Sequence, residues 1–246
     1  MTARPVLEAH DIEKTLGQGA AAVRALMGVS MALYSGELTL LRGPSGSGKT
    51  TLMSILGGIL APTSGSIHVA GQCLSGLSEE VLAGVRRKDV GFIFQSYNLF
   101  PTLTALQNVT LAGTVQFRRV KEASDRAKAA LEAVGLSSKL NSYPAQLSGG
   151  EQQRVAVARA IAGGPSVLLA DEPTAALDGE NGRTVMALLS HLAASTPCAV
   201  LVVTHDERTL PYADRVISME DGRIINEQIM ARGGASRNGQ GEALHV

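Results

Sequence analysis

The sequence has few cysteines, no excess of charge of either sign and no long hydrophobic run. Its two cysteines, Cys73 and Cys198, lie far apart among 246 residues, and neither belongs to a C-x-x-C pair. We expect both to be reduced, buried, small hydrophobic residues, and neither a zinc site nor a structural disulfide is indicated. Basic and acidic residues each number 22, so the formal net charge is zero. A nucleic-acid binder usually has a basic excess, so we expect no nucleic-acid partner.

No apolar run approaches the roughly 20 residues that a membrane-spanning helix needs. The first five residues, Met-Thr-Ala-Arg-Pro, are followed by no apolar segment of the kind that a secretory signal contains. Hydrophobic residues make up 45% and charged residues 18%, which is typical of a globular chain with a sizeable core. We therefore expect a cytoplasmic protein, whose association with a membrane would have to come through a partner.

Residues 43–50 carry the pattern G-x-x-x-x-G-K-[ST] of a phosphate-binding loop. The apolar run 38–41 before them has strand length, and 51–56 after them contains no helix breaker. The alternative, a Gly/Ser-rich turn that binds nothing, is disfavoured by this strand-loop-helix context. Glycines let successive N–H groups turn toward one anion at a helix N-terminus. In such a loop Lys49 would reach the β- and γ-phosphates and Thr50 would hold Mg²⁺. The predicted nucleotide-binding residues here are Gly43, Pro44, Ser45, Gly46, Ser47, Gly48, Lys49, Thr50 and Thr51.

Two carboxylates, Asp171 and Glu172, follow the apolar run 167–170. In folds with a phosphate-binding loop, the strand that carries such an acid lies near the loop, so Asp171 could hold the Mg²⁺ shell. Glu172 could orient or deprotonate the attacking water, which is worth about 10²–10⁴ in rate. The alternative is that both acids merely cap the next helix, with Pro173 in its first turn.

The pattern of the chain predicts strands that alternate with helices. Candidate strands are 6–9, 25–33, 66–69, 90–94, 167–170, 199–203 and 216–219, and helices are expected from 78 to 88 and around 185–189. From 96 to about 162 helical periodicity dominates, with one face predicted to hold Val120, Ala123, Ala127, Leu131 and Val134. Continuous apolar strands alternating with helices favour an α/β fold with a mainly parallel sheet covered on both sides.

A short segment, Leu147-Ser148-Gly149-Gly150-Glu151, precedes another apolar helical face. Ser148 and Glu151 have the spacing of a capping box at a helix N-terminus. A cap does not need two glycines, however, and Gly149 and Gly150 would leave that N-terminus bare enough for an anion to approach. Both interpretations can hold at once.

These segments, in this order, resemble the ATPase subunits of ABC transporters over about residues 5–228. The matching features are the phosphate loop, Gln95 as the Q-loop, Leu-Ser-Gly-Gly as the signature, Asp171-Glu172 as Walker B, Ala-Ala-Leu-Asp at 175–178 as the D-loop, and His205 as the switch histidine. Alone, Gln95 would be a polar strand end and His205 part of a capping turn. The resemblance implies a P-loop NTPase domain over 1–228. It would comprise a core of 1–95 and 163–228 with an N-terminal antiparallel β subdomain, an inserted α-helical subdomain at about 96–162, and a flexible tail at 229–246.

The resemblance also implies roles for these residues. Two copies would associate head-to-tail around two ATP molecules, each ATP contacting the phosphate loop of one copy and the signature residues Ser148, Gly149, Gly150 and Glu151 of the other. Glu172 and His205 would be catalytic, Thr50, Gln95 and Asp171 would hold Mg²⁺, and Asp178 would couple the two sites across the interface.

Several segments, including 95–101, 103–109 and 170–178, resemble the macrolide-export and lipoprotein-release type of ABC ATPase (MacB- and LolD-like), closest to DevA-type exporter ATPases. Such subunits work on the inner face of the inner membrane with a four-helix permease that has a large periplasmic domain, and exporters add a periplasmic adaptor and an outer-membrane channel. Residues 97–100 would be the docking segment for the permease; the alternative is an ordinary loop. Rival functions are a regulatory ABC ATPase of the cell-division type, another soluble ABC ATPase, and a scaffold without hydrolysis, which Glu172 and His205 disfavour.

One departure from the family pattern concerns the base of the nucleotide. ABC ATPases usually stack adenine on an aromatic residue just before the glycine-rich turn at 17–19, where this chain has Leu16. No Phe, Tyr or Trp occurs before Tyr34. We therefore expect apolar contact from Leu16 but no stacking, whose loss is worth about 0.5–1.5 kcal/mol.

Overall fold

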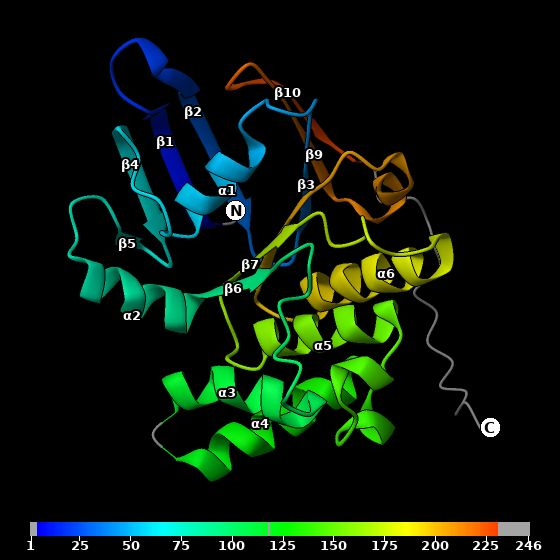
Figure 1. Cartoon of the computed structure of the whole chain (residues 1–246). Coiled ribbons are helices and arrows are strands. Elements are labelled where there is room, and N and C mark those ends of the chain that lie inside the picture. Colours follow the sequence, from blue (N-terminus) through cyan, green and yellow to red (C-terminus); the bar gives the residue numbers. More distant parts are fainter. Residues whose placement is uncertain (1–3, 118, 231–246) are drawn as a thin grey trace.

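A computed structural model describes residues 4–117 and 119–230, which form two sheets and a group of helices (Figure 1). The strands are β1 (Pro5–Leu16), β2 (Val23–Tyr34), β3 (Leu38–Arg42), β4 (Ser64–Val69), β5 (Gln72–Cys73), β6 (Val90–Ile93), β7 (Val167–Asp171), β8 (Ala199–Val203), β9 (Arg215–Glu220) and β10 (Arg223–Ile229). The helices are α1 (Lys49–Leu56), α2 (Glu79–Asp89), α3 (Ala105–Gln116), α4 (Val120–Ala133), α5 (Gly149–Ile161) and α6 (Gly179–Ser195), with 3-10 turns η1 (Gly19–Ala21), η2 (Ser137–Lys139), η3 (Pro144–Gln146) and η4 (Glu207–Tyr212).

The central sheet has six strands in the order β10-β9-β3-β8-β7-β6, and all of its pairs are parallel except β10 with β9. Strand β3 lies between β8 and β9, so the strand that leads into the phosphate loop is held on both sides. Its residues 38–41 are all buried, as are 199–203 of β8. Burial on both faces explains why these strands read as continuous apolar runs, and the predicted mainly parallel core sheet is confirmed.

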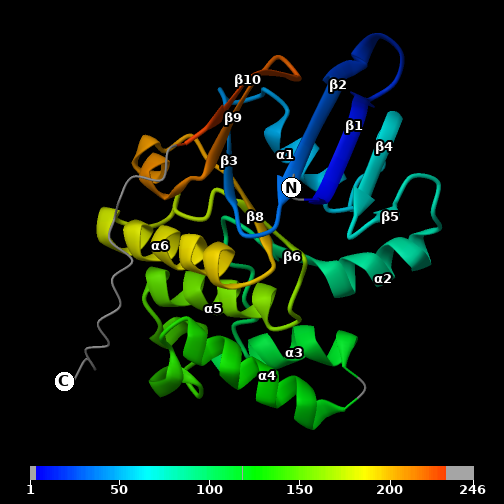
Figure 2. The ribbon, with the colours of Figure 1, turned by 180° about the vertical axis from the view of Figure 1, so that it is seen from behind.

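The second sheet is antiparallel, in the order β2-β1-β4-β5. It stands over one face of the central sheet, with α1 between the two, whereas α5 and α6 cover the opposite face (Figures 1 and 2). One group of buried side chains joins both sheets and α1, including Leu26, Ile55 and Leu201. A second group joins the central sheet to α5, α6 and the helices beyond them. The expected N-terminal antiparallel sheet and the helical region are therefore both present.

In the helical region, α3 and α4 pack beside α5 (Figure 1). Four of the five predicted face residues are buried: Ala123, Ala127, Leu131 and Val134. The prediction is wrong for Val120, which is 70% exposed because it is the first residue of α4 and lies at the end of the helix. No helix among the described residues is both long enough and apolar enough to cross a membrane.

The predicted C-terminal tail, 229–246, lies outside the described residues except for its first two. Ile229 is the last residue of β10, and the N–H of Met230 donates to the carbonyl of Asp214 at 2.8 Å. These two residues therefore extend the central sheet.

The cysteines differ from each other. Cys198 is buried and Cys73 is exposed, and both are free thiols. The prediction that Cys73 is buried is wrong because it lies in β5, a two-residue strand at the edge of the antiparallel sheet.

This difference predicts the thiol chemistry of the folded protein. Burial raises the pKa of Cys198 to about 12, so its nucleophilic thiolate is scarce at neutral pH. A colorimetric thiol reagent at pH 8 should titrate one fast thiol in the native chain and two after denaturation. Cys73→Ser should remove the fast thiol, and a fast thiol that remains in that variant would contradict the assignment.

Candidate nucleotide-binding site

A cleft of about 1090 Å³ opens at the carboxyl ends of β3, β7 and β8. In parallel α/β sheets, ligands bind beyond the carboxyl ends of the strands. The cleft brings together twelve residues that the sequence predicts for the site: Gly43, Pro44, Ser45, Gly46, Gly48, Lys49, Thr50, Thr51, Gln95, Asp171, Glu172 and His205. Ser47, although part of the loop, is buried and does not line the cleft. The signature residues and Asp178 do not line the cleft either.

The phosphate loop is closed around its own lysine. The Lys49 ammonium donates to the carbonyls of Gly43 at 2.8 Å and Pro44 at 2.7 Å, and to the Ser47 hydroxyl at 3.3 Å. Burial lowers the pKa of Lys49, against the opposing pull of Glu172 and Asp171. The Lys49 ammonium is thus held beside the N-terminus of α1. The first turn of this helix is closed by the Leu52 N–H, which donates to the Gly48 carbonyl.

Gly43 is required by close packing. Its φ is +155°, and a Cβ added there would lie 2.0 Å from the Met219 carbonyl oxygen of β9. A backbone atom cannot move out of the way as a side chain can, so only glycine fits.

Gly43→Ala should lower the free energy of unfolding by roughly 2–3 kcal/mol because it combines a steric clash with backbone strain. Urea denaturation without nucleotide would measure the loss. Gly46→Ala is the matched control, because Gly46 also has a positive φ, +81°, but its Cβ would meet nothing within 4 Å. Equal losses in the two variants would show that the contact with Met219 contributes nothing.

The loop is supported from behind by the turn between β9 and β10. The Gly222 N–H donates to the Ser47 carbonyl at 3.1 Å, and the Met27 N–H of β2 donates to the Gly222 carbonyl at 2.9 Å. Asp221 and Gly222 also line the cleft. Sequence reasoning missed this support, although Asp221-Gly222 is a strong hairpin-turn signal.

Where the base of a nucleotide would lie, the cleft is lined by Leu16, Val23, Arg24, Ala25 and Met27. Leu16 and Val23 are cross-strand partners in β1 and β2, and both are exposed. Apolar contact from Leu16 is therefore geometrically available, as the sequence predicts, and Val23 is a second aliphatic side chain that the sequence reading missed.

Two oxygen ligands suited to a hard cation face each other beside the loop. The Thr50 hydroxyl donates to Oδ2 of Asp171 at 3.5 Å. Asp171 is half-buried at the end of β7, and burial, reinforced by the neighbouring Glu172 charge, raises its pKa. Its carboxylate is thus partly desolvated, and a cation bound beside it would favour the charged form.

The raised pKa of Asp171 predicts a pH-dependent cost to stability. Between the ordinary pKa of an aspartate, about 4, and the higher pKa of Asp171 in the folded chain, the folded state binds more protons than the unfolded state. Raising the pH through this range therefore lowers the stability of the folded chain. The loss is complete once the pH is above the folded-state pKa. Without nucleotide, Asp171→Asn should melt at a higher temperature than the parent at pH 7, by a margin that narrows toward pH 4.

Asp178→Asn is the control of opposite sign for that experiment, measured by the same melting curves. The pKa of Asp178 is lowered, first by the N–H of Asn181, so removing its charge should lower the melting temperature at pH 7. Equal melting temperatures of the parent and Asp171→Asn at every pH would show that the Asp171 charge does not destabilise the folded chain.

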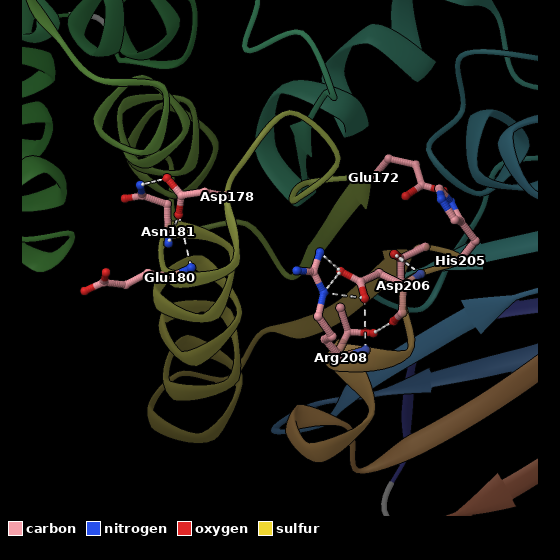
Figure 3. Close-up of polar contacts among 9 residues, drawn as sticks. Glu172, Asp178, Glu180, Asn181, His205, Asp206 and Arg208 are labelled. Atoms are coloured by element: carbon pink, nitrogen blue, oxygen red, sulfur yellow. Dashed lines mark hydrogen bonds and ion pairs between the residues drawn. The ribbon is translucent and has the colours of Figure 1, made fainter.

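Glu172 and His205 form a pair at the cleft (Figure 3). Oε1 of Glu172 lies 2.7 Å from Nδ1 of His205, and their side chains are 18% and 75% exposed. An ionised carboxylate only accepts, so Nδ1 carries the hydrogen. Glu172 has φ +47°, and its N–H donates to the Val203 carbonyl at 2.8 Å. The strained backbone is thus fixed by β8 and aims the carboxylate at the histidine.

Neither Glu172 nor His205 is itself a helix cap, although His205 does lie in the expected capping turn before η4. The helix after β7 begins only at Gly179, and Asp178, not Asp171 or Glu172, accepts the N–H groups of Glu180 and Asn181 at its start (Figure 3). Likewise Asp206, not His205, caps η4 by accepting the Arg208 N–H at 2.9 Å. Glu172 and His205 are therefore not used as helix caps.

The signature segment forms the predicted capping box. The Ser148 hydroxyl accepts the Glu151 N–H at 3.2 Å, and Oε2 of Glu151 accepts the Ser148 N–H at 2.8 Å. The latter bond is the largest cause of the lowered pKa of Glu151. The structure also shows close packing at both glycines, which the sequence does not reveal. A Cβ on Gly150 would lie 2.3 Å from Oδ1 of Asn181, and a Cβ on Gly149 would lie 3.1 Å from the Tyr97 hydroxyl. Their role toward an anion remains a prediction.

Comparison with known proteins agrees with this geometry. The family profile of ABC transporters matches residues 26–175. The chain is 45% identical over 221 residues to the macrolide export ATP-binding/permease protein MacB of Shigella flexneri and 43% identical over 220 residues to an uncharacterized ABC transporter ATP-binding protein of Methanocaldococcus jannaschii. These matches cover 90% and 89% of this chain, and 34% and 98% of the two relatives. The chain therefore spans about a third of the length of MacB.

Among solved structures, the chain is similar to the dimeric ATP-binding cassette MJ0796 bound to ADP and Pi, with a TM-score of 0.82 and 38% identity over 91% of this chain and 98% of that one. The fold and the site thus define a P-loop ATP-binding cassette. The chain belongs to the ABC transporter family, of the type whose similar relatives include the ATP-binding part of MacB.

Proposed function

We propose that this chain is the ATP-binding and ATP-hydrolysing motor subunit of an ABC transporter complex. The observation that carries the proposal is the Glu172–His205 pair, held 2.7 Å apart in the same cleft as Lys49 and Asp171. Glu172 is the general base that orients and deprotonates the attacking water. His205, whose ring is mostly exposed, contacts the γ-phosphate on the side away from Glu172.

Mg²⁺ fits the oxygen ligands of the site. It takes one or two protein ligands and completes its shell with phosphate oxygens and water. The Thr50 hydroxyl and the Asp171 carboxylate would hold it, with Gln95 nearby in the cleft. When bound there, the ion would supply positive charge that offsets the negative charge developing on the phosphates. Lys49 would exchange its loop carbonyls for phosphate oxygens.

A second copy of the chain would complete the site. The capped N-terminus of α5, with Ser148, Gly149, Gly150 and Glu151, does not line the chain's own cleft. Helix N-termini attract phosphate groups, so this segment is available to a nucleotide held by another copy. Asp178 is exposed at the start of α6, close to the signature through Asn181. A head-to-tail dimer around two ATP molecules would use both segments, with Asp178 linking the two sites.

The partner driven by this ATPase would be a membrane permease. At the predicted docking segment, 97–100, lies a groove of about 580 Å³. Its lining includes Phe92, Phe94 and Asn98 and the basic residues Arg87 and Lys88. We propose that this groove takes a cytoplasmic helix of a four-helix permease with a large periplasmic domain. The ATPase would then lie on the inner face of the inner membrane, and in an exporter a periplasmic adaptor and an outer-membrane channel would complete the path.

Affinity capture tests this proposal. A tagged Glu172→Gln chain would be extracted from native membranes in mild detergent with ATP and Mg²⁺, and co-purifying proteins would be identified by mass spectrometry. We expect the tagged Glu172→Gln chain to capture, in the presence of ATP, a four-helix membrane protein with a large external domain. A tagged Lys49→Ala chain should not capture it. Recovery only from the soluble fraction, with no membrane protein, would overturn the transporter role. A permease-like partner without adaptor or transported substrate would favour the regulatory, cell-division type of ATPase.

A further inference from the structure

Helix α5 carries a carboxylate at the end where an anion is expected to bind. A helix N-terminus attracts negative charge with a strength equivalent to roughly half a positive charge. Glu151 is the third residue of α5, and its pKa is lowered, first by the N–H of Ser148, so the side chain is ionised at neutral pH. Its full negative charge in the first turn more than cancels the attraction of the helix for a phosphate.

Lys139 lies beside this carboxylate. Its Nζ is 3.3 Å from Oε1 of Glu151, while Oε2 of the same carboxylate accepts the Ser148 N–H at 2.8 Å. Each oxygen therefore has its own donor, which fixes the orientation of the carboxylate. The side chains of Lys139 and Glu151 are 40% and 20% exposed, so solvent screens their attraction only in part.

The lysine is placed by the turn that precedes the signature segment. Lys139 is the last residue of η2, where its N–H donates to the Leu136 carbonyl at 3.0 Å and its carbonyl accepts the Ser142 N–H at 3.0 Å. Leu136 is buried in the core of the helical region, so the turn is anchored there. The cation beside Glu151 thus comes from a separate element that is itself held in place.

The net charge at this end of α5 changes sign with Lys139. The helix contributes roughly half a positive charge, Glu151 one negative charge and Lys139 one positive charge, so the N-terminus is negative without the lysine and positive with it. The capping box uses the N–H groups of Ser148 and Glu151 and does not use those of Gly149 and Gly150. With the carboxylate neutralised, these two N–H groups can serve an incoming phosphate.

We propose that Lys139 is a positioning residue for the signature segment. It neutralises and orients Glu151, so that the N-terminus of α5 accepts the triphosphate of a nucleotide held by a second copy. A glutamine in place of Glu151 would cap the helix without a charge, so the lysine is needed only because a glutamate stands there. The inference rests on the proposed function, since it concerns the contact through which that ATPase dimerises.

Dimerisation of the Glu172→Gln chain, followed by sedimentation at matched protein concentration, tests this role. Lys139→Ala should need about five- to tenfold more ATP for half-dimerisation than the parent. In a chain that also carries Glu151→Gln, Lys139→Ala should change half-dimerisation by less than about twofold, because no carboxylate charge is left to neutralise. The loss caused by Lys139→Ala alone should shrink as salt is added, because salt screens partly exposed charges.

Lys139→Arg keeps the charge and should dimerise within about twofold of the parent, and Lys128→Ala, at an exposed lysine of α4, is the matched control. Melting temperatures would identify any variant whose fold is impaired. An equal loss with and without Glu151→Gln, or Lys139→Ala curves that superimpose on the parent at low salt, would overturn the role. A parent that binds ATP without dimerising would instead overturn the head-to-tail assembly of the proposed function.

An NMR titration with inorganic tripolyphosphate keeps the role of Lys139 testable in that case. In a Lys49→Ala chain, whose own phosphate loop is weakened, the amide signals of Gly149 and Gly150 should shift as tripolyphosphate is added. Lys139→Ala should raise the half-saturating concentration about five- to tenfold, and should not raise it when Glu151→Gln is also present. Amide signals that do not shift, or a half-saturating concentration that Lys139→Ala leaves unchanged, would refute the inference whatever the state of assembly.

Discussion

Glu172→Gln should slow ATP hydrolysis by about 10²–10⁴ while ATP still binds. The side chain is largely shielded from solvent, and its backbone is fixed to β8, so glutamine can occupy the same position. The amide cannot accept a proton from water, however, and it would also present a neutral partner to Nδ1 of His205. The change therefore removes the base and leaves the phosphate loop intact.

Phosphate release at saturating ATP would measure this loss, and binding of a fluorescent ATP analogue would establish that the cleft is still competent. Glu132→Gln is the matched control, because Glu132 is an exposed glutamate on α4, away from the cleft. Hydrolysis within threefold of the parent in Glu172→Gln would show that another group accepts the proton.

Lys49→Ala should weaken ATP binding by about ten- to 150-fold, since a hydrogen bond to a charged group is worth about 1.5–3 kcal/mol. Lys49 is already folded into the loop on the carbonyls of Gly43 and Pro44, so it reaches the phosphates with little reorganisation. Its removal also leaves these carbonyls without their donor, which should loosen the loop itself. Hydrolysis at low ATP should fall in proportion to the lost affinity.

Isothermal titration with ATP and Mg²⁺ would measure the change, with Lys128→Ala on α4 as an exposed lysine control. Because loss of the loop donor could also lower stability, the melting temperature of each chain would be compared before titration. Unchanged affinity in a folded Lys49→Ala chain would remove the lysine from the predicted nucleotide site.

What could be predicted from the sequence was mostly local. The phosphate loop with its flanking strand and helix, the capping box at Ser148, and the apolar strand before Asp171 each depend on neighbours within a few residues, and the structure has all three. The family resemblance supplied the rest of the site, since neither Gln95 nor His205 carries a local signal that separates it from an ordinary strand end or turn.

Contacts between distant segments could not be predicted in this way. Gly43 fits against Met219 only because β9 pairs with β3, and Gly150 fits against Asn181 only because α5 and α6 meet at their N-termini. The exposed positions of Cys73 and Val120 likewise depend on where the sheet and the helix end. A one-dimensional pattern of polar and apolar residues records none of these packing partners.

The order of the central strands bears on how the chain can be divided. The ABC transporter profile ends at residue 175, yet β3, which leads into the phosphate loop, has as its two neighbours β8 and β9, both beyond that point. A fragment cut to the matched region would keep every residue of the loop and lose both strands that hold β3. We therefore expect that the most recognisable stretch of this sequence would not fold by itself, because the strand that leads into its phosphate loop has both of its sheet partners in the part of the chain after residue 175.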